Sequence, residues 1–134
     1  MGIGPRLRIA ATCAATVTAV VAVGGCASGG GRPDATARLQ IVAPTAGQVS
    51  GTDVNLKLRL VGGRLVALTT KAVRPNEGHI HVFVDNALVS MTKGLDQDLH
   101  LPAGTHGVRA EFVAADHAPF KNPVVAAVAF HVAG

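Results

Sequence analysis

Apolar and polar residues alternate along much of the second half of the chain. In DVNLKLRL (53–60) every second position is valine or leucine, and asparagine, lysine and arginine stand between them. The same alternation returns in GVRAEFVA (107–114) and VVAAVAFHV (124–132). A period of two with one apolar face is typical of a half-buried β-strand. These and shorter patterns predict strands at about 38–42, 54–61, 79–85, 88–92, 97–101, 107–115 and 124–132.

Turn-forming residues separate these segments, and no long segment has helical periodicity. APTAG (43–47), the Gly62–Gly63 pair, DNA (85–87) and LPAGTH (101–106) mark the breaks. The stretch Gly63–Glu77 is either a long loop or a loop with a short strand at 65–69. The pattern predicts an all-β fold, an immunoglobulin-like antiparallel β-sandwich of about seven strands over residues 38–134. Leu58 and Phe112 lie on the apolar faces of the two most regular strands and are predicted core residues.

The N-terminal segment has the pattern of a secretory signal. Arg6 and Arg8 precede an uncharged run at 9–23, and VGGC (23–26) follows it. Ending on Cys26, the segment resembles the lipobox of bacterial lipoproteins, which implies cleavage before Cys26 and fatty acylation, such as with palmitate, of that cysteine. An uncleaved membrane helix is the alternative, but the run at 9–23 is shorter than the ~20 apolar residues of a span.

This resemblance implies both a domain division and a location. Residues 1–25 are a lipoprotein signal peptide, 26–37 are the lipidated cysteine with a flexible linker, and 38–134 are the sandwich. The protein is expected on the cell membrane, lipid-anchored and facing outside the cytoplasm.

Composition narrows the functions that remain. Because Cys13 and Cys26 are the only cysteines, the segment 38–134 has no disulfide, thiolate metal site or cysteine nucleophile. Without Arg6 and Arg8 the 12 basic residues become 10 against 8 acidic ones, and there is no Trp or Tyr, which argues against a nucleic-acid partner. No serine lies in a nucleophile-elbow context. A pair of nearby aspartates, Asp96 and Asp98, is better explained as a solvated strand face. We therefore predict that the protein is not an enzyme.

The segment GHIHVFVD (78–85) contains the residues best suited to chemistry. Its isoleucine and valines form one apolar face, so His79 and His81 share the opposite face. Two imidazoles at positions i and i+2 of a strand are close enough to bind one ion. The alternative is a polar sheet face on which histidine is tolerated.

Together with LPAGTHGVRAEF (101–112), IVAPTAGQVSGTDVNLKLRL (41–60) and ADHAPF (115–120), this segment resembles a group of small bacterial envelope domains, mostly of unknown function. The resemblance covers nearly all of residues 39–132. It implies an immunoglobulin-like fold and an envelope location, but no reaction.

In such a sandwich the strands at 79–85 and 107–115 are antiparallel neighbours. His79 and His81 should therefore lie close to His117, under the Gly63–Glu77 loop and near the carboxylates of Glu77 and Asp116. This set is suited to Zn²⁺ or Cu²⁺. The alternative is that His117 bonds within its own loop.

The other histidines are expected to have simpler roles. His106 follows LPAG, where sandwiches place a corner tyrosine, so we expect it to bond back to the upstream backbone. His100 and His131 fall on the polar faces of their strands and are expected to be solvated.

The sequence favours a lipid-anchored, non-catalytic binding or interaction domain whose partner is the membrane and an unidentified envelope protein or ligand. The alternative is a copper- or zinc-binding module that uses the histidines, and a third is a structural spacer.

Overall fold

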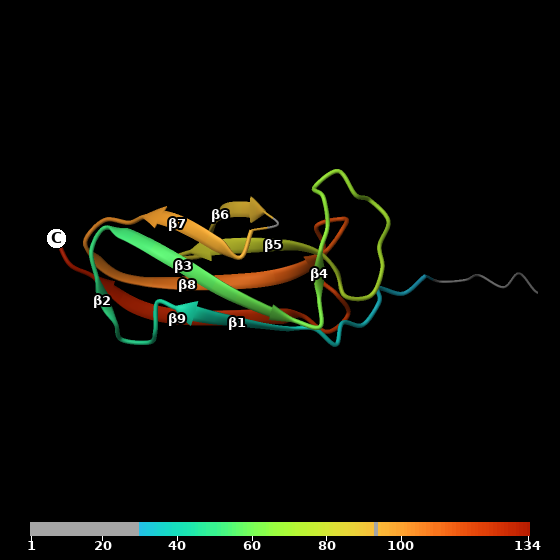
Figure 1. Ribbon diagram of the computed structural model, residues 1–134, viewed down its shortest axis with the longest axis horizontal. Coiled ribbons are helices and arrows are strands. Elements are labelled where there is room, and N and C mark those ends of the chain that lie inside the picture. The colour runs from blue at the N-terminus through green and yellow to red at the C-terminus, as the bar shows by residue number, and fades with distance from the viewer. Residues whose placement is uncertain (1–29, 93) are drawn as a thin grey trace, which may run out of the picture.

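Two β-sheets pack face to face in the computed structural model (Figure 1). The structure describes residues 30–92 and 94–134. The predicted signal peptide 1–25 and Cys26 lie outside the described residues. Among the described residues, no helix is long and apolar enough to cross a bilayer.

The strands form a three-stranded sheet of order β1-β3-β7 and a larger sheet of order β2-β9-β8-β5-β4, with β6 also paired to β5. Pairing is antiparallel except between β2 and β9 and between β4 and β5. This order confirms the immunoglobulin-like sandwich. The strands are β1 (Arg38–Ala43), β2 (Val49–Ser50), β3 (Asp53–Val61), β4 (Arg64–Leu65), β5 (Glu77–Val84), β6 (Ala87–Thr92), β7 (Asp96–His100), β8 (Gly104–Ala114) and β9 (Val124–Val132).

All seven predicted strands are present, and the two additional ones are two residues long. The stretch Gly63–Glu77 contains one of these short strands, β4. The alternative of a loop with a short strand is therefore closer to the structure than a plain loop, although the strand begins one residue earlier and is shorter than the predicted 65–69. Neither β2 nor β4 is long enough to show a period of two, which is why the sequence pattern misses them.

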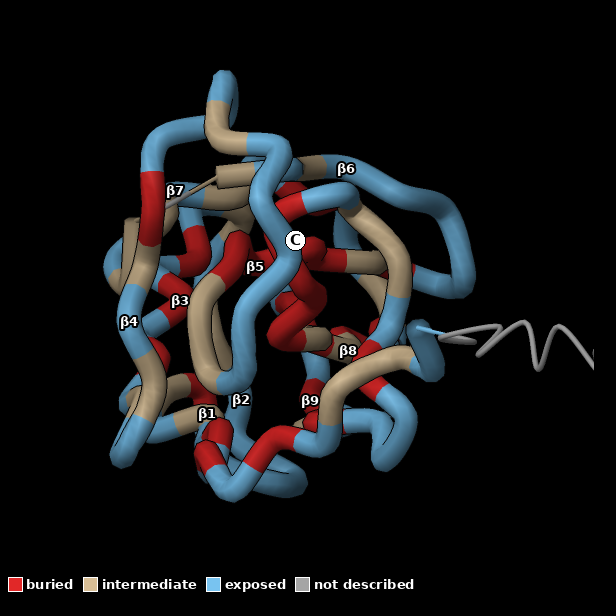
Figure 2. Tube along the Cα trace, turned by 90° about the vertical axis from the view of Figure 1, so that its right-hand side faces the viewer, coloured by how far each residue is buried: buried red, intermediate tan, exposed pale blue. Residues whose placement is uncertain are grey.

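The core lies between the two sheets, where the buried residues gather in Figure 2. Leu58 is 7% exposed and Phe112 is fully buried, so both predicted core residues are confirmed. The buried positions of β3, and those of β8 as far as Phe112, follow the alternation read from the sequence. Val113, on the other face of β8, is buried as well. The core therefore forms because period-two strands each turn one apolar face inward.

Gly78, at the start of β5, lies against the backbone of β8. A Cβ atom at this position would be 1.7 Å from the carbonyl oxygen of Val113 and 3.0 Å from the Cα of Ala114. Only glycine allows the two strands to approach so closely here. This contact fixes the start of β5, directly before His79.

Residues 32–37, which we call the strap, pack against the sandwich before β1 begins. Ala35 and Ala37 are 4% and 6% exposed. The backbone N–H of Ala35 donates to Asn122 Oδ1 at 2.7 Å, and Asn76 Oδ1 accepts from the N–H of Ala37 at 2.9 Å. These residues fall in the segment 26–37 that was predicted as linker, so the packed part of the chain begins before Arg38.

His106 closes the corner before β8. Its Nε2 donates to the carbonyl oxygen of Pro102 at 2.8 Å, which confirms the predicted bond to the upstream backbone, and its Nδ1 lies 2.7 Å from Asp85 Oδ2. Because both partners are acceptors, the imidazolium form satisfies both bonds. Asp85 and the Pro102 carbonyl accordingly raise the pKa of His106. The N–H of Gly107 and then His106 lower the pKa of Asp85.

Candidate functional site: the histidine end of the sandwich

Antiparallel pairing of β5 and β8 brings the candidate histidines to one end of the sandwich. Gly78 pairs with Ala114 and His79 with Val113, so the loop that follows β8 begins beside the start of β5. His117 lies in that loop, in a left-handed conformation with φ of 64°. The expected meeting of the three histidines therefore occurs.

The imidazole of His117 stacks on those of both His79 and His81. The ring of His117 lies 4.5 Å from that of His79, with 20° between the planes, and 5.5 Å from that of His81, with 18° between the planes. His81 Nε2 and His117 Nδ1 are 3.3 Å apart, within hydrogen-bonding distance, so one of the two nitrogens donates and the other accepts. The two rings therefore share a single proton between them in this arrangement.

His79 is the most enclosed member of the group. It is fully buried, and its Nε2 lies 3.1 Å from the carbonyl oxygen of Ala67. Since a carbonyl oxygen only accepts, Nε2 carries a hydrogen and donates it to Ala67. The Nδ1 of His79 is buried without a hydrogen-bond partner. The contact with Ala67 also shows that the loop between β4 and β5 lies against His79, as expected.

The surroundings of His81 favour its neutral form. Its side chain is largely buried, and burial is the main cause that lowers the pKa of His81. Repulsion from His117 and His79 lowers it further, and Glu111 opposes this shift. A neutral imidazole is the form that accepts hydrogen bonds and binds metal ions.

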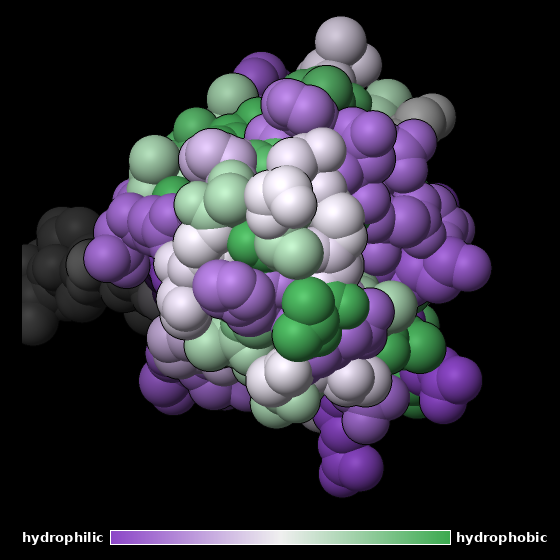
Figure 3. Space-filling model, turned by 90° about the vertical axis from the view of Figure 1, so that its left-hand side faces the viewer, coloured by the Kyte–Doolittle hydropathy of each residue, from purple (hydrophilic) through white to green (hydrophobic). Residues whose placement is uncertain are grey.

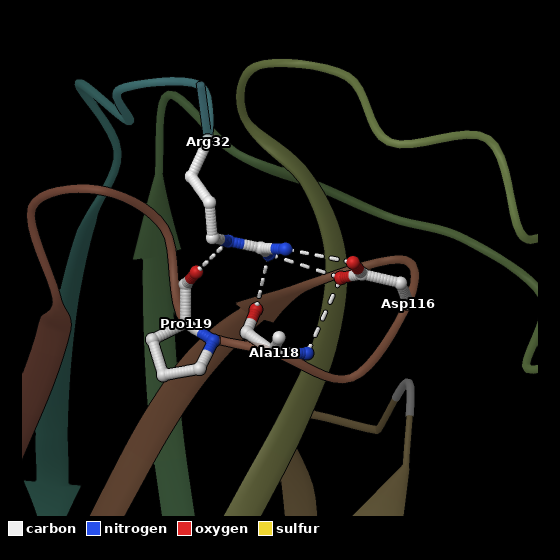
Figure 4. Close-up of polar contacts among 4 residues, drawn as sticks. All are labelled: Arg32, Asp116, Ala118 and Pro119. Carbon is white, nitrogen blue, oxygen red and sulfur yellow. Dashed lines mark hydrogen bonds and ion pairs between the residues drawn. The ribbon is translucent and has the colours of Figure 1, made fainter. Parts of the chain in front are cut away.

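Asp116 does not join the histidines, because Arg32 binds both of its oxygens (Figure 4). The distances are 2.7 Å from Nη1 to Oδ2 and 3.0 Å from Nη2 to Oδ1. The same guanidinium donates to the carbonyl oxygens of Ala118 and Pro119. The hydrogen bond from Arg32 lowers the pKa of Asp116 to about 2. Arg32 thus ties the strap to the loop that contains His117.

Glu77 is likewise held by an arginine, with 2.6 Å between Arg64 Nη2 and Glu77 Oε1. Across residues 30–92 and 94–134, no group of three or more His, Cys, Asp or Glu side chains is placed to hold a metal ion. The suggested ligand set of three imidazoles with Glu77 and Asp116 is therefore not assembled here. His117 stacks on the other two rings, only the nitrogens of His81 and His117 approach each other, and both carboxylates form ion pairs with arginines.

The strap, which connects both loops around the histidines, was not predicted from the sequence. Its small residues have the composition of a tether, and its partners Asn76 and Asn122 are separated from it by 39 to 87 positions. Asn76 has a φ of 59°, a conformation that asparagine tolerates well. An asparagine next to a proline or a strand was the only available signal, and it does not identify a partner.

A second feature lies along β6, the strand that pairs with β5 in the larger sheet. Leu88, Val89 and Met91 are 46%, 50% and 51% exposed. Met91 is directly opposite His81 in the ladder, so the two share a face. Nearby, the guanidinium of Arg109 lies 3.7 Å from the centre of the Phe83 ring. The exposed strand thus borders the histidine cluster.

No protein-family model matches the chain, and no curated protein matches it. Among solved structures, the chain is similar to a fibronectin(III)-like module of Clostridium thermocellum CbhA, with 14% sequence identity and a TM-score of 0.48. The match covers 70% of this chain and 94% of the module. The assignment of the fold rests on the sheet order and the core described above.

Proposed function

We propose that this protein is a lipid-anchored, non-catalytic binding domain that stands on the cell membrane and faces outside the cytoplasm. The anchor is supported by the VGGC segment at 23–26, which resembles a lipobox. Lipoprotein acylation supplies at least two chains, enough for stable attachment. The absence of a recognisable nucleophile or catalytic pair in the sequence supports the non-catalytic part.

The binding role rests on one observation, the composition and exposure of the edge strand β6. Within the described residues β6 pairs only with β5, so its other edge has unpaired backbone N–H and C=O groups. Edge strands are usually protected by charge or proline, but ALVSMT (87–92) contains neither. An extended segment of another envelope protein could add to this edge, with backbone hydrogen bonds for affinity and Leu88 and Val89 for apolar contact.

Site-specific crosslinking in living cells tests this role. A photoreactive amino acid at Leu88 should give a discrete adduct, whereas the same group at Arg59, exposed on the other sheet, should give none. Mass spectrometry of the adduct would identify the crosslinked segment. Adducts at neither position, or equal adducts at both, would contradict the assignment of β6. An adduct to a second copy of this chain would show that β6 mediates self-association and does not bind another envelope protein.

Incorporation of radiolabelled fatty acid tests the anchor. The natural protein should carry label and fractionate with membranes, and Cys26→Ala should lose both properties. A Cys26→Ala protein that still carries label and still sediments with membranes would eliminate acylation at this cysteine.

A copper- or zinc-binding module is the second candidate, and the distance between His81 Nε2 and His117 Nδ1 favours it. Their 3.3 Å separation matches the distance between two ligands around a tetrahedral ion with metal–nitrogen bonds of ~2.0 Å. An ion could therefore replace the shared proton, with His79 contributing after rotation of its ring. Calorimetric titration with Cu²⁺ and Zn²⁺ should show binding that is lost in His79→Ala/His81→Ala. Equal affinity of that variant would eliminate the site.

A further inference from the structure

The loop at residues 66–76, which we call the basic loop, combines exposed apolar and basic side chains. Leu68 is 45% exposed and Val73 is 39% exposed. Lys71 and Arg74 are exposed too, and the loop contains no acidic residue. In the described part of the chain neither cation forms an ion pair. Apolar side chains beside unpaired cations are the composition of surfaces that bind anionic membranes.

The basic loop lies at the same end of the sandwich as residues 30–37, the first described part of the chain (Figure 1). Val73 lines one cavity of about 410 Å³ together with Gly30, Gly31, Arg32 and Pro33. Asn76, at the end of the loop, accepts hydrogen bonds from the strap. The loop and the first described residues are therefore neighbours in space.

This position limits the distance between the loop and a lipid on Cys26. Four residue steps separate Cys26 from Gly30, and an extended chain spans at most ~3.6 Å per residue, which gives about 14 Å. A domain attached this closely has its N-terminal end within reach of the headgroups. The Debye length at physiological salt, ~8 Å, allows Lys71 and Arg74 to be attracted to them once they approach that closely.

The opposite end of the sandwich lacks this charge. Residues 44–52, which include the short strand β2, and the turns at 85–86 and 101–103 contain no lysine or arginine and include Asp85. Figure 3 shows this end, with pale and green residues in the middle and purple ones around them. It too has an exposed apolar residue, Val49, which is 64% exposed. Only the histidine end therefore combines apolar exposure with unpaired basic side chains in a loop.

We propose that the basic loop binds the bilayer surface, with Leu68 and Val73 at the boundary between headgroups and acyl chains and Lys71 and Arg74 against anionic phospholipid headgroups. This inference rests on the proposed lipid anchor, and it adds a defined orientation. The histidine end faces the membrane, and the far end points away from it. The basic loop also covers His79 through the carbonyl of Ala67, so the membrane and the histidine cluster contact the same loop.

Tryptophan fluorescence can report this orientation, because the chain has no Trp and no Tyr. The acylated protein carrying Val73→Trp is reconstituted in vesicles of phosphatidylcholine and phosphatidylglycerol with brominated acyl chains. Val49→Trp, at the opposite end, is the matched control. Emission from position 73 should fall by about half, since interfacial side chains enter the bilayer by ~5–10 Å, whereas emission from position 49 should not change. Quenching at position 73 should decline to the control level with phosphatidylcholine alone or in Lys71→Glu/Arg74→Glu.

Two results would overturn the proposal. Equal quenching at both positions would show that the domain has no fixed orientation. An emission at position 73 that is blue-shifted but unquenched would show that a protein surface, not lipid, covers the loop. Circular dichroism of each variant verifies that the sandwich is retained.

Flotation with vesicles and the mass of the N-terminal peptide test the anchor separately. If Cys26 is not acylated, the same Trp variants are coupled to a maleimide lipid, which reacts only with Cys13 or Cys26, both N-terminal to the domain. Stronger quenching at position 73 than at position 49 would then support the orientation, although the natural anchor had failed. Equal quenching would refute the orientation.

Discussion

Gly78→Ala tests the close approach of β5 and β8 that fixes the histidine end. The new Cβ would lie 1.7 Å from the carbonyl oxygen of Val113. To restore an ordinary carbon–oxygen contact distance, one strand must move by roughly 1 Å or more, and the closely packed interior resists this movement. The atom in the way belongs to the backbone, so a change of side-chain rotamer cannot relieve the contact.

The expected loss of stability combines three contributions. Overpacking costs ~1–3 kcal/mol. Displacement of β5 also weakens backbone hydrogen bonds, including the 3.0 Å bond from the N–H of Val66 to the carbonyl of Gly78, at ~0.5–1.5 kcal/mol each. Replacing glycine by alanine restores ~0.4–1 kcal/mol by restricting the unfolded chain. Gly78→Ala should therefore lose about 2–4 kcal/mol of unfolding free energy.

Urea unfolding followed by far-ultraviolet circular dichroism is the assay, because the chain has no Trp or Tyr to give a fluorescence signal. Gly107→Ala is the matched control, since a Cβ on Gly107 has nothing within 4 Å. That variant should be neutral or slightly more stable. An unchanged urea midpoint for Gly78→Ala, or equal shifts for both variants, would refute the reasoning.

Further predictions concern the core residue Leu58 and the corner residue His106. Leu58→Ala should lose about 2–5 kcal/mol of unfolding free energy, measured in urea, because it removes a buried side chain. Lys57→Ala, on the exposed face of β3, should change stability little. Equal effects of the two variants would contradict the assignment of faces. His106→Ala should cost most stability between pH 3.8 and 6.5, the ordinary pKa values of aspartate and histidine. Because the pKa of His106 is raised, its contribution to folding stability is present below pH 6.5 and is lost as the pH rises through the raised pKa. Because the pKa of Asp85 is lowered, its contribution to folding stability is present above pH 3.8 and is lost as the pH falls through the lowered pKa. Urea midpoints measured across this range check the prediction, and a stability difference that does not change with pH would contradict it.

The fold was predictable because its main strands are long and most of them have one buried face, although β5 is buried on both. A period of two over the nine residues of β3, and over β8 from His106 to Phe112, leaves only one way to bury the apolar side chains. The meeting of His79, His81 and His117 followed from the same information, because neighbouring antiparallel strands place the start of one beside the end of the other. His106 was found because a corner residue bonds to the backbone a few positions upstream, within the same short segment.

The tertiary structure alone decided which groups the polar side chains contact. Asp116 binds Arg32, 84 positions away, and no periodic pattern encodes a pairing between two loops. The stacked rings and the unpaired His79 Nδ1 depend on rotamers and on a left-handed turn at His117, which are set by the surrounding packing. Gly78 is equally silent in the sequence, because the need for glycine arises from a neighbouring strand that lies 35 positions further on, at Val113. Sequence determines the faces of strands through local alternation, whereas contacts between loops exist only after the strands have brought those loops together.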